Sequence, residues 1–427
     1  MTFRGPRPRP GHWLIGATYL GTAACWTFST PVWDVNSGVL VSQLLGALAL
    51  TGFAWVFFIA TRARPLDALF DGLDKAYLTH KWLGIGSVAL VVAHLITMHA
   101  ADDRPADGYG RQHPEGLGAL GLPSLALFVV LVLVTLLAGR TSYENWKATH
   151  LILVLSYALG LAHYSNTSAY GNFSLSPFSL WLNLVNLCGV LAATYVLVFN
   201  RKFAFRYKYE VAAVRSVAVG TVELTGTPKG RAMSHRPGQF AFMKLSGRRI
   251  RFPSHPFTIS SSPKAQQIQF TIKSLGDHTA HLGDAIEVGD EFALSGPHGR
   301  FDYTKASRRQ LWIAGGIGIT PFRSFLASAV PAEFSVDLFY AYHGHAQAAY
   351  LDELTAMATG NLRLHLVDDT VDGFLTAAQI EQQIDGGTPV DVFFCGPEPL
   401  RRAIKSGLRR SQIEVLSFHA EAFRFGR

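Results

Sequence analysis

Long apolar runs fill the first half of the chain, and only short polar segments separate them. Six such runs lie at about 13–33, 38–60, 78–99, 122–138, 148–164 and 178–199. Most approach the ~20 residues that a helix needs to cross a bilayer, and the fourth and fifth are shorter, at about 17 residues each. A cleaved signal peptide does not explain the first run, because five more follow it. The pattern predicts an all-α transmembrane bundle of six helices over residues 1–205.

The second half changes first to short alternating runs bounded by turn residues. Strands are predicted at 207–215, 217–225, 239–245, 268–274 and 290–295, which indicates an antiparallel β-barrel over residues 206–305. From about residue 310, strands at 311–315, 335–342, 362–367, 390–394 and 413–418 alternate with helices near 321–329, 350–358, 376–384 and 397–409. This alternation predicts an α/β domain with a parallel sheet over residues 306–427. The expected fold class is therefore multi-domain.

Composition supports this division. The chain has 427 residues, of which 49% are hydrophobic and 16% are charged. Residues 1–210 hold 15 Lys and Arg and 10 Asp and Glu, which leaves 23 and 20 of the totals of 38 and 30 for the rest. Three scattered cysteines indicate neither a disulfide framework nor a Cys-based metal site. The soluble half has no basic patch with interleaved aromatic residues, so nucleic-acid binding is not expected.

Positive charge in the connecting segments predicts the orientation in the membrane. With a cytoplasmic N-terminus, thirteen of the fifteen Lys and Arg in residues 1–210 fall inside, and only Arg104 and Arg111 fall outside. Six helices return the chain to the cytoplasm. We therefore expect a multi-pass protein of the inner cell membrane, surrounded by lipid, with the second half cytoplasmic.

Four histidines interrupt the apolar runs. His80 and His94 lie in the third run, and His150 and His163 lie in the fifth. The pattern offers two His pairs at two depths, and two facing imidazoles can ligate a haem iron. The spacings of 14 and 13 residues correspond to about 21 and 20 Å along a helix, but 13 steps miss the same face by about 140°. The fifth helix would have to be tightened or bent locally, and Gly160 is a plausible place. Polar contacts between helices are the alternative interpretation.

The soluble half carries motifs suited to flat rings and phosphates. An aromatic residue followed by a hydroxyl, as in His255-Pro256-Phe257-Thr258, can stack on a ring and hydrogen-bond its edge. Gly276 and Thr279 fall in a turn that suits a phosphate. The first parallel strand runs into a glycine-rich turn that suits a pyrophosphate, and a later strand ends in a second turn. The residues of these two turns are Gly315, Gly316, Gly318, Thr320 and Pro321, and then Cys395, Gly396 and Pro397.

Together these features resemble the NADPH oxidase / ferric reductase superfamily, in a short bacterial form with a reductase module like that of ferredoxin-NADP reductase. The resemblance implies two b-type haems held by His80, His94, His150 and His163. It implies FAD near His255, Pro256, Phe257, Thr258, Gly276 and Thr279, and NADPH or NADH at the two strand-end turns. A C-terminal aromatic residue, Phe425 rather than Phe423, is expected to cover the flavin. Cys395, Thr258 and Phe425 are the residues expected to touch the reacting groups.

The function implied by this resemblance is electron transfer from cytoplasmic NAD(P)H through FAD and two haems to an acceptor on the far side. The first choice of acceptor is O2, giving superoxide; a ferric chelate or a periplasmic partner protein are the alternatives. Two departures from the family pattern bear on this. Tyr342-His343-Gly344-His345 stands where NADPH-preferring members often have an Arg, and Met98 stands where oxidases often have a further His. A membrane sensor that binds NAD(P)H without redox chemistry is the remaining alternative.

Overall fold

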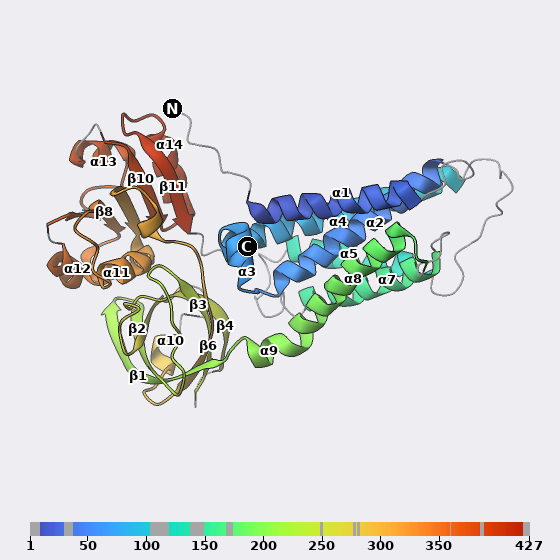
Figure 1. Cartoon of the computed structure of the whole chain (residues 1–427). Helices are drawn as coiled ribbons and strands as arrows, with labels where there is room; N and C mark the ends of the chain where they lie inside the picture. Colours follow the sequence, from blue (N-terminus) through green and yellow to red (C-terminus); the bar gives the residue numbers. More distant parts are fainter. Residues whose placement is uncertain are drawn as a thin grey trace. The chain divides into compact units, whose positions relative to one another are not determined.

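The computed structural model describes residues 9–29, 37–102, 119–136, 149–167, 174–247, 251–275, 279, 282–358, 360–384 and 388–421. The described part of the chain divides into two compact units, residues 8–201 and residues 202–423, which are treated separately below. Figure 1 shows that the first unit is built from helices and that the second contains both sheets.

The first unit is helical throughout its described residues. Its elements are α1 (Pro10–Ser29), α2 (Ser37–Ala60), α3 (Pro65–Phe70), α4 (Leu73–Asp102), α5 (Gly121–Leu136), α7 (Leu153–Thr167), α8 (Pro177–Thr194) and the π-helical turn η3 (Tyr195–Phe199). Within the described residues, three helices are long and apolar enough to cross a membrane: Ser37–Ala60, Leu73–Ala101 and Pro177–Phe199. Gly121–Thr135 is apolar but shorter. The described residues thus confirm a helical region with about three apolar spans, and the count of six stays a prediction.

Small and hydroxyl-bearing residues let these helices approach one another, as is common inside membranes. The Thr22 hydroxyl lies 3.0 Å from the Thr51 hydroxyl of α2, and the Trp181 indole donates to Thr22 at 3.0 Å. The ring of Phe53 on α2 stacks on the ring of Phe128 on α5, with 4.2 Å between the ring centroids. These contacts join α1, α2, α5 and α8 into one bundle (Figure 1).

The segment that carries His150 is tightened, as the histidine spacing requires. The amide of Ile152 donates to Thr149 O at 3.1 Å, and the amide of Leu155 donates to Ile152 O at 2.9 Å, which are three-residue steps. A tightened turn advances by about 120° per residue instead of 100°, so it reduces the angular deficit between His150 and His163. The tightening lies at the start of the segment and not at Gly160, where we expected it, because Gly160 falls within regular helix.

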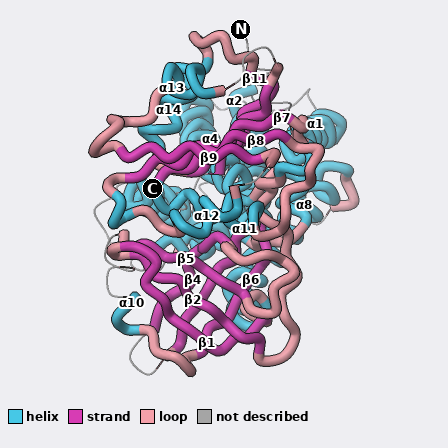
Figure 2. The backbone as a smooth tube through the Cα atoms, turned by 90° about the vertical axis from the view of Figure 1, so that its left-hand side faces the viewer, coloured by secondary structure: helices cyan, strands magenta, loops and turns pink. Residues whose placement is uncertain are grey.

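The second unit begins with the short helix α9 (Asn200–Phe203) and an antiparallel sheet. Its strands are β1 (Tyr207–Ala218), β2 (Thr221–Pro228), β3 (Phe240–Ser246), β4 (Arg251–Thr258), β5 (Ile268–Lys273) and β6 (Glu291–His298), and α10 (Leu282–Ala285) precedes β6. The order β4-β3-β6-β1-β2-β5 leaves β4 and β5 at the edges. An isolated bridge between Ile259 and Phe270 joins these edges, so the sheet curves into a partly closed barrel (Figure 2). The five predicted strands are present, and β4 is a sixth that the pattern showed only as an extended segment.

A parallel sheet follows, as the alternation predicted. After the turn η4 (Tyr303–Lys305), its elements are β7 (Arg309–Gly315), η5 (Gly316–Ile319), α11 (Thr320–Leu326), β8 (Ser335–Tyr342), η6 (His345–Gln347), α12 (Leu351–Met357), β9 (Leu362–Asp368), α13 (Ala377–Gln383), β10 (Val390–Cys395), α14 (Glu398–Leu408) and β11 (Val415–Glu421). The order is β11-β10-β7-β8-β9. The chain builds outward from β7 on one side and returns to β10 on the other. The strand order therefore reverses between β7 and β10, which is where ligands bind in such sheets.

Asp337 of β8 holds a buried charge cluster in this sheet. Its carboxylate lies 2.5 Å from Arg309 Nη2, 2.8 Å from Arg363 Nε and 2.9 Å from His365 Nε2. Burial alone would raise the pKa of Asp337, but the hydrogen bonds from His365 and Arg363, together with the Arg309 charge, outweigh it and lower the pKa to about 2.

Asp337→Asn is therefore expected to destabilise the sheet by about 2 kcal/mol at pH 7. Because the folded pKa lies below the unfolded one, this stability is present above about pH 4 and is lost as the pH falls toward 2. Denaturant unfolding of the detergent-purified protein across this range measures it. Glu291→Gln, which removes an exposed partner of Lys229, is the control and should change little. A difference between wild type and Asp337→Asn that persists unchanged at pH 2 would contradict the assignment.

Candidate functional site

The structure brings the four membrane histidines together in the predicted pairs. The ring centroids of His80 and His150 lie 6.1 Å apart, and those of His94 and His163 lie 6.2 Å apart. Two metal–imidazole bonds of about 2 Å each, plus roughly 1 Å from nitrogen to ring centre on either side, add up to about 6 Å. The spacing of both pairs therefore fits two imidazoles on opposite sides of one iron atom.

In three of the four histidines a hydrogen-bond contact engages the ring at Nδ1. His80 Nδ1 lies 3.0 Å from Val56 O, His94 Nδ1 lies 2.8 Å from Ser42 O, and His150 Nδ1 lies 3.2 Å from Thr135 Oγ1. Nδ1–H donation to such oxygens favours the tautomer in which Nε2 would be the nitrogen that ligates a metal. The polar helix–helix contacts of the alternative interpretation do occur, but in these three rings they engage Nδ1.

The sequence did not single out these supporting groups. Val56 acts through its backbone oxygen, which any residue would offer, so no sequence signal marks it. Ser42 and Thr135 are hydroxyl residues inside apolar runs, a signal that is weak because such residues are common in membrane helices.

The segment expected to hold the flavin forms strand β4. Its residues pair with β3, with His255 opposite Met243, Phe257 opposite Ala241 and Thr258 opposite Phe240. Thr258 is buried, yet its hydroxyl has no hydrogen-bond partner among the described residues. The Ser254 hydroxyl on the same strand is in the same condition. Buried polar groups are nearly always paired, so these two hydroxyls are suited to hydrogen-bond a ligand with polar edges.

The other expected flavin contacts are described only in part. Thr279 closes a turn, because its hydroxyl accepts from the Leu275 amide at 2.7 Å and lies 3.0 Å from Leu275 O. Gly276 and Phe425 lie outside the described residues, so their expected roles stay predictions.

The two strand-end turns expected to hold the nucleotide lie side by side at the point where the strand order reverses. Cys395 pairs with Ala314 across β10 and β7. A Cβ on Gly318 would lie 2.1 Å from Cys395 O, and one on Gly315 would lie 2.7 Å from Pro397 Cδ. Only glycine allows this close approach of the two turns. Gly316, with φ of +53°, has no atom within 4 Å of its missing Cβ, so its free side can accept a ligand.

Thr320 and Pro321 begin α11 directly behind the first turn. The Thr320 hydroxyl donates to Ile317 O at 3.1 Å and thereby ties the helix start to the glycine segment. Both residues are buried. Their expected contact with the nucleotide stays a prediction.

Cys395 is fully buried at the carboxyl edge of β10. Burial, with a smaller contribution from the charge of Glu421, raises the pKa of Cys395 well above its usual range. The side chain is therefore a neutral thiol at pH 7. Glu421 ends the neighbouring strand β11 opposite Cys395 and is itself buried. The sequence did not single out Glu421, because only the parallel pairing of β10 and β11 places it at this edge.

A buried ionic network joins the barrel to the α/β domain. Glu223 of β2 accepts from Arg323 Nη1 of α11 at 3.1 Å and from the Tyr350 hydroxyl at 2.8 Å. Arg323 also contacts Glu353 of α12 at 2.7 Å, and its guanidinium lies 4.2 Å from the Tyr350 ring centre. Burial raises the pKa of Tyr350, so its hydroxyl stays protonated and donates. The network fixes the barrel against the nucleotide-binding sheet.

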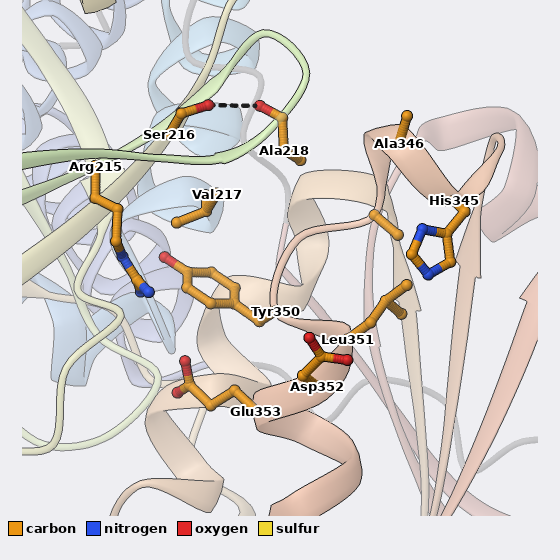
Figure 3. Close-up of a pocket in the computed structure, with 11 residues that line it drawn as sticks. Arg215, Ser216, Val217, Ala218, His345, Ala346, Tyr350, Leu351, Asp352 and Glu353 are labelled. Atoms are coloured by element: carbon orange, nitrogen blue, oxygen red, sulfur yellow. Dashed lines mark hydrogen bonds between the residues drawn. The ribbon is translucent and has the colours of Figure 1, made fainter.

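A cavity of about 350 Å³ opens beside this network, between the end of β1 and the start of α12. Figure 3 shows Arg215, the hydroxyl end of Tyr350 and Glu353 turned toward the same region. Arg215 Nη2 reaches Glu223 Oε1 at 3.1 Å, from the side opposite to Arg323. The cavity belongs to the domain junction and lies away from the two glycine turns.

Comparison with known protein families gives three matches in chain order. Residues 45–161 match the family described as ferric reductase like transmembrane component. Residues 206–306 match an FAD-binding domain, and residues 312–406 match an oxidoreductase NAD-binding domain. The first match covers His80, His94 and His150 and ends before His163, and the other two cover β4 and both glycine turns.

Curated relatives align with the soluble half. The electron transfer component of 2-halobenzoate 1,2-dioxygenase from Burkholderia cepacia is 27% identical over 201 residues, 44% of this chain and 58% of that protein. The carnitine monooxygenase reductase subunit of Escherichia coli is 33% identical over 142 residues, 33% of this chain and 43% of that protein. The chain thus spans about half the length of these relatives.

Solved structures are more distant. A flavohemoglobin from Malassezia yamatoensis gives a TM-score of 0.49 at 18% identity, over 91% of this chain and 99% of that one. The family models carry the assignment. The chain belongs to the ferric reductase-like family of FAD- and NAD(P)-dependent oxidoreductases, with a ferric reductase-like transmembrane component followed by FAD-binding and NAD-binding domains.

Proposed function

We propose that the protein transfers electrons across the membrane, from cytoplasmic NAD(P)H through FAD and two b-type haems to O2 on the far side, giving superoxide. The proposal is supported mainly by the two facing histidine pairs, His80/His150 and His94/His163, whose ring centroids lie 6.1 and 6.2 Å apart. The same chain also has FAD- and NAD-binding domains. FAD supplies the link between a two-electron donor and single-electron carriers, and the haems carry single electrons. Six membrane helices with both chain ends in the cytoplasm complete the proposed arrangement.

The residues of this chain hold and orient these groups. His80 and His150 hold the inner haem, and His94 and His163 hold the outer one. Phe257 and Thr258 hold the flavin ring, with His255 and Pro256 beside it and Gly276 and Thr279 at its phosphates. The two glycine turns, residues 315–318 and 395–397, receive the nucleotide, and the neutral Cys395 thiol offers a polar contact without nucleophilic character. Phe425 covers the flavin.

The choice of acceptor follows from the donor set. With an imidazole from each histidine of a pair, a haem iron would keep no protein-free position for the acceptor, so the acceptor would be reduced without binding to the iron. A small diffusible molecule needs no dedicated pocket for such a reaction, and O2 meets this condition most simply. A ferric chelate or a periplasmic protein is the outcome to expect if superoxide does not appear.

The test uses the purified full-length chain. Adding NADH or NADPH without oxygen should give a reduced-minus-oxidised spectrum of b-type haem, and admitting oxygen should give cytochrome c reduction that superoxide dismutase suppresses. Absence of the haem spectrum would refute the proposed electron transfer through haem as a whole. A full haem signal with rapid ferric-chelate reduction and no superoxide would support electron transfer through FAD and haem, with a ferric chelate as the acceptor instead of O2.

NADH is expected to be the better donor. Asp368 ends β9 and Asp369 follows it, at the same edge of the sheet as the glycine turns. Asp369 Oδ1 lies 2.6 Å from His343 Nδ1. Hydrogen bonds from Thr370, with a further one from the Gly344 amide, lower the pKa of Asp368, so it is charged at pH 7. A carboxylate at such an edge suits the ribose 2′-hydroxyl of NADH and repels the 2′-phosphate of NADPH.

We expect kcat/KM for NADH to exceed that for NADPH by about tenfold or more, which corresponds to ~1.4 kcal/mol. The measurement is steady-state reduction of an artificial acceptor with each nucleotide. Asp369→Ser should narrow the ratio by improving NADPH, while Asp284→Ser, in α10 of the barrel, should leave it unchanged. A preference for NADPH in the wild type would refute the argument from charge.

A further inference from the structure

Helices α2 and α5 contact the histidines in a regular pattern. Val56 and Ser42 of α2 lie against His80 and His94 of α4, and the two members of each pair are 14 residues apart along their own helix. Thr135 and Gly121 of α5 lie against His150 and His163, and they are also 14 residues apart. Fourteen residues rise about 21 Å, so each supporting helix matches both depths of the helix it accompanies.

The inner pair is held by hydrogen bonds from both supporting helices. The Thr135 hydroxyl donates to Leu131 O at 2.8 Å, so it is free to accept from His150 Nδ1 at 3.2 Å. His80 donates to Val56 O on the other side. The two rings are inclined by 51° to each other.

The outer pair combines hydrogen bonding of His94 to Ser42 with close contacts between both rings and glycines. A Cβ on Gly121 would lie 2.9 Å from both Cε1 and Nδ1 of His163, closer than real side chains approach. A Cβ on Gly46, one turn from Ser42, would lie 3.3 Å from His94 Nδ1. His94 Nδ1 also lies 2.9 Å from the Ser42 hydroxyl. The rings are inclined by 72°.

We propose that α2 and α5 form a scaffold that sets the orientation of the four histidine rings, with Thr135 as the positioning residue of the inner site and Gly121 and Gly46 as those of the outer site. The proposal rests on haem ligation as set out under the proposed function. The physical basis is that outer groups fix the tautomer and ring orientation of a metal-bound histidine and tune its basicity. In this chain the Thr135 hydroxyl fulfils that role at the inner depth, and at the outer depth Ser42 and the missing side chains of Gly121 and Gly46 fulfil it together.

Gly121→Ala is the decisive variant. The added methyl must displace the His163 ring, so we expect the outer haem to change its midpoint potential and its low-spin ferric EPR signal, or to be lost. The inner haem should keep both properties. Gly86→Ala is the matched control, because Gly86 lies on α4 between His80 and His94 and has no atom within 4 Å of its missing Cβ. Potentiometric titration and low-temperature EPR of the purified chain in lipid nanodiscs give both readouts without relying on turnover.

Two further variants keep the proposal testable if Gly121→Ala does not fold. Gly46→Ala makes the milder contact and should shift the same haem by a smaller amount. Thr135→Val should shift the potential of the inner haem alone, and Thr135→Ser should restore it, which a merely structural role would not predict.

The outcomes separate this inference from the function beneath it. Wild-type protein without low-spin haem would overturn both. Two haems in the wild type, with Gly121→Ala and Gly46→Ala indistinguishable from Gly86→Ala, would overturn only the scaffold. Equal changes of both haems in Gly121→Ala would overturn it as well, because the contact with His163 is confined to one depth.

Discussion

His94→Ala should stop electron transfer across the membrane while the cytoplasmic reductase stays active. The proposed outer haem depends on His94 and His163, and with one imidazole gone the site has lost half of its protein ligands. We expect the transmembrane rate to fall by more than about 100-fold, since loss of a group that merely supports a ligand already costs 10–100-fold. Reduction of a soluble artificial acceptor by NADH should persist, because it needs only the FAD- and NAD-binding domains.

His99→Ala is the control for this variant. His99 lies on the same helix, five residues further on, and its side chain is exposed. It should leave both haems and the transmembrane rate unchanged. The measurements are the reduced-minus-oxidised spectrum of the purified protein and acceptor reduction outside liposomes with NADH enclosed on the cytoplasmic side. Survival of both haems in His94→Ala would show that the ligand assignment is wrong.

Arg323→Met should loosen the junction between the barrel and the α/β domain. Arg323 and Glu223 are both buried, and removing the arginine leaves the Glu223 carboxylate without its main compensating charge. Breaking a buried pair in this way costs about 3–5 kcal/mol. Methionine keeps most of the volume, so the effect reports the charge rather than a cavity.

A second arginine on the same carboxylate provides a matched control. Arg215 contacts Glu223 Oε1 at 3.1 Å, but 60% of its side chain is exposed. Arg215→Met should therefore cost less than about 1 kcal/mol. Thermal unfolding monitored by flavin release compares the two, and stopped-flow reduction of the flavin by NADH tests the functional consequence, which we expect only in Arg323→Met. Equal destabilisation by both variants would mean that burial does not determine how much each arginine contributes to the stability of this network.

The local periodicity of the chain determined most of its secondary structure. The helices at 37–60 and 177–199 and all five parallel strands follow the apolar pattern closely, because a helix or a buried strand must place apolar side chains at its own regular interval. The same regularity marked His80, His94, His150 and His163 as misfits in apolar runs. Strand β4 was less visible, since two prolines, Pro253 and Pro256, and polar residues interrupt its alternation.

The sequence could not show what surrounds the candidate site. Val56, Ser42 and Gly121 lie 24, 52 and 42 residues from the histidines they contact, and no pattern along the chain links them. Glu421 reaches Cys395 only because β11 pairs with β10, and Glu223 meets Arg323 only because the barrel packs on α11.

The sequence by itself therefore determined the elements, the order of the three regions and the spacing of the four histidines. The elements depend on residues within one or two turns, or within one strand, of each other, and the order of the regions and the histidine spacing are read directly along the chain. The tertiary structure decided which nitrogen of His80, His94 and His150 is engaged, which two strand-end turns lie side by side and which charges are buried together. These features depend on the packing of segments that are distant in the sequence. The interaction free energy of such contacts changes over distances of a few ångströms, which no local pattern along the chain encodes.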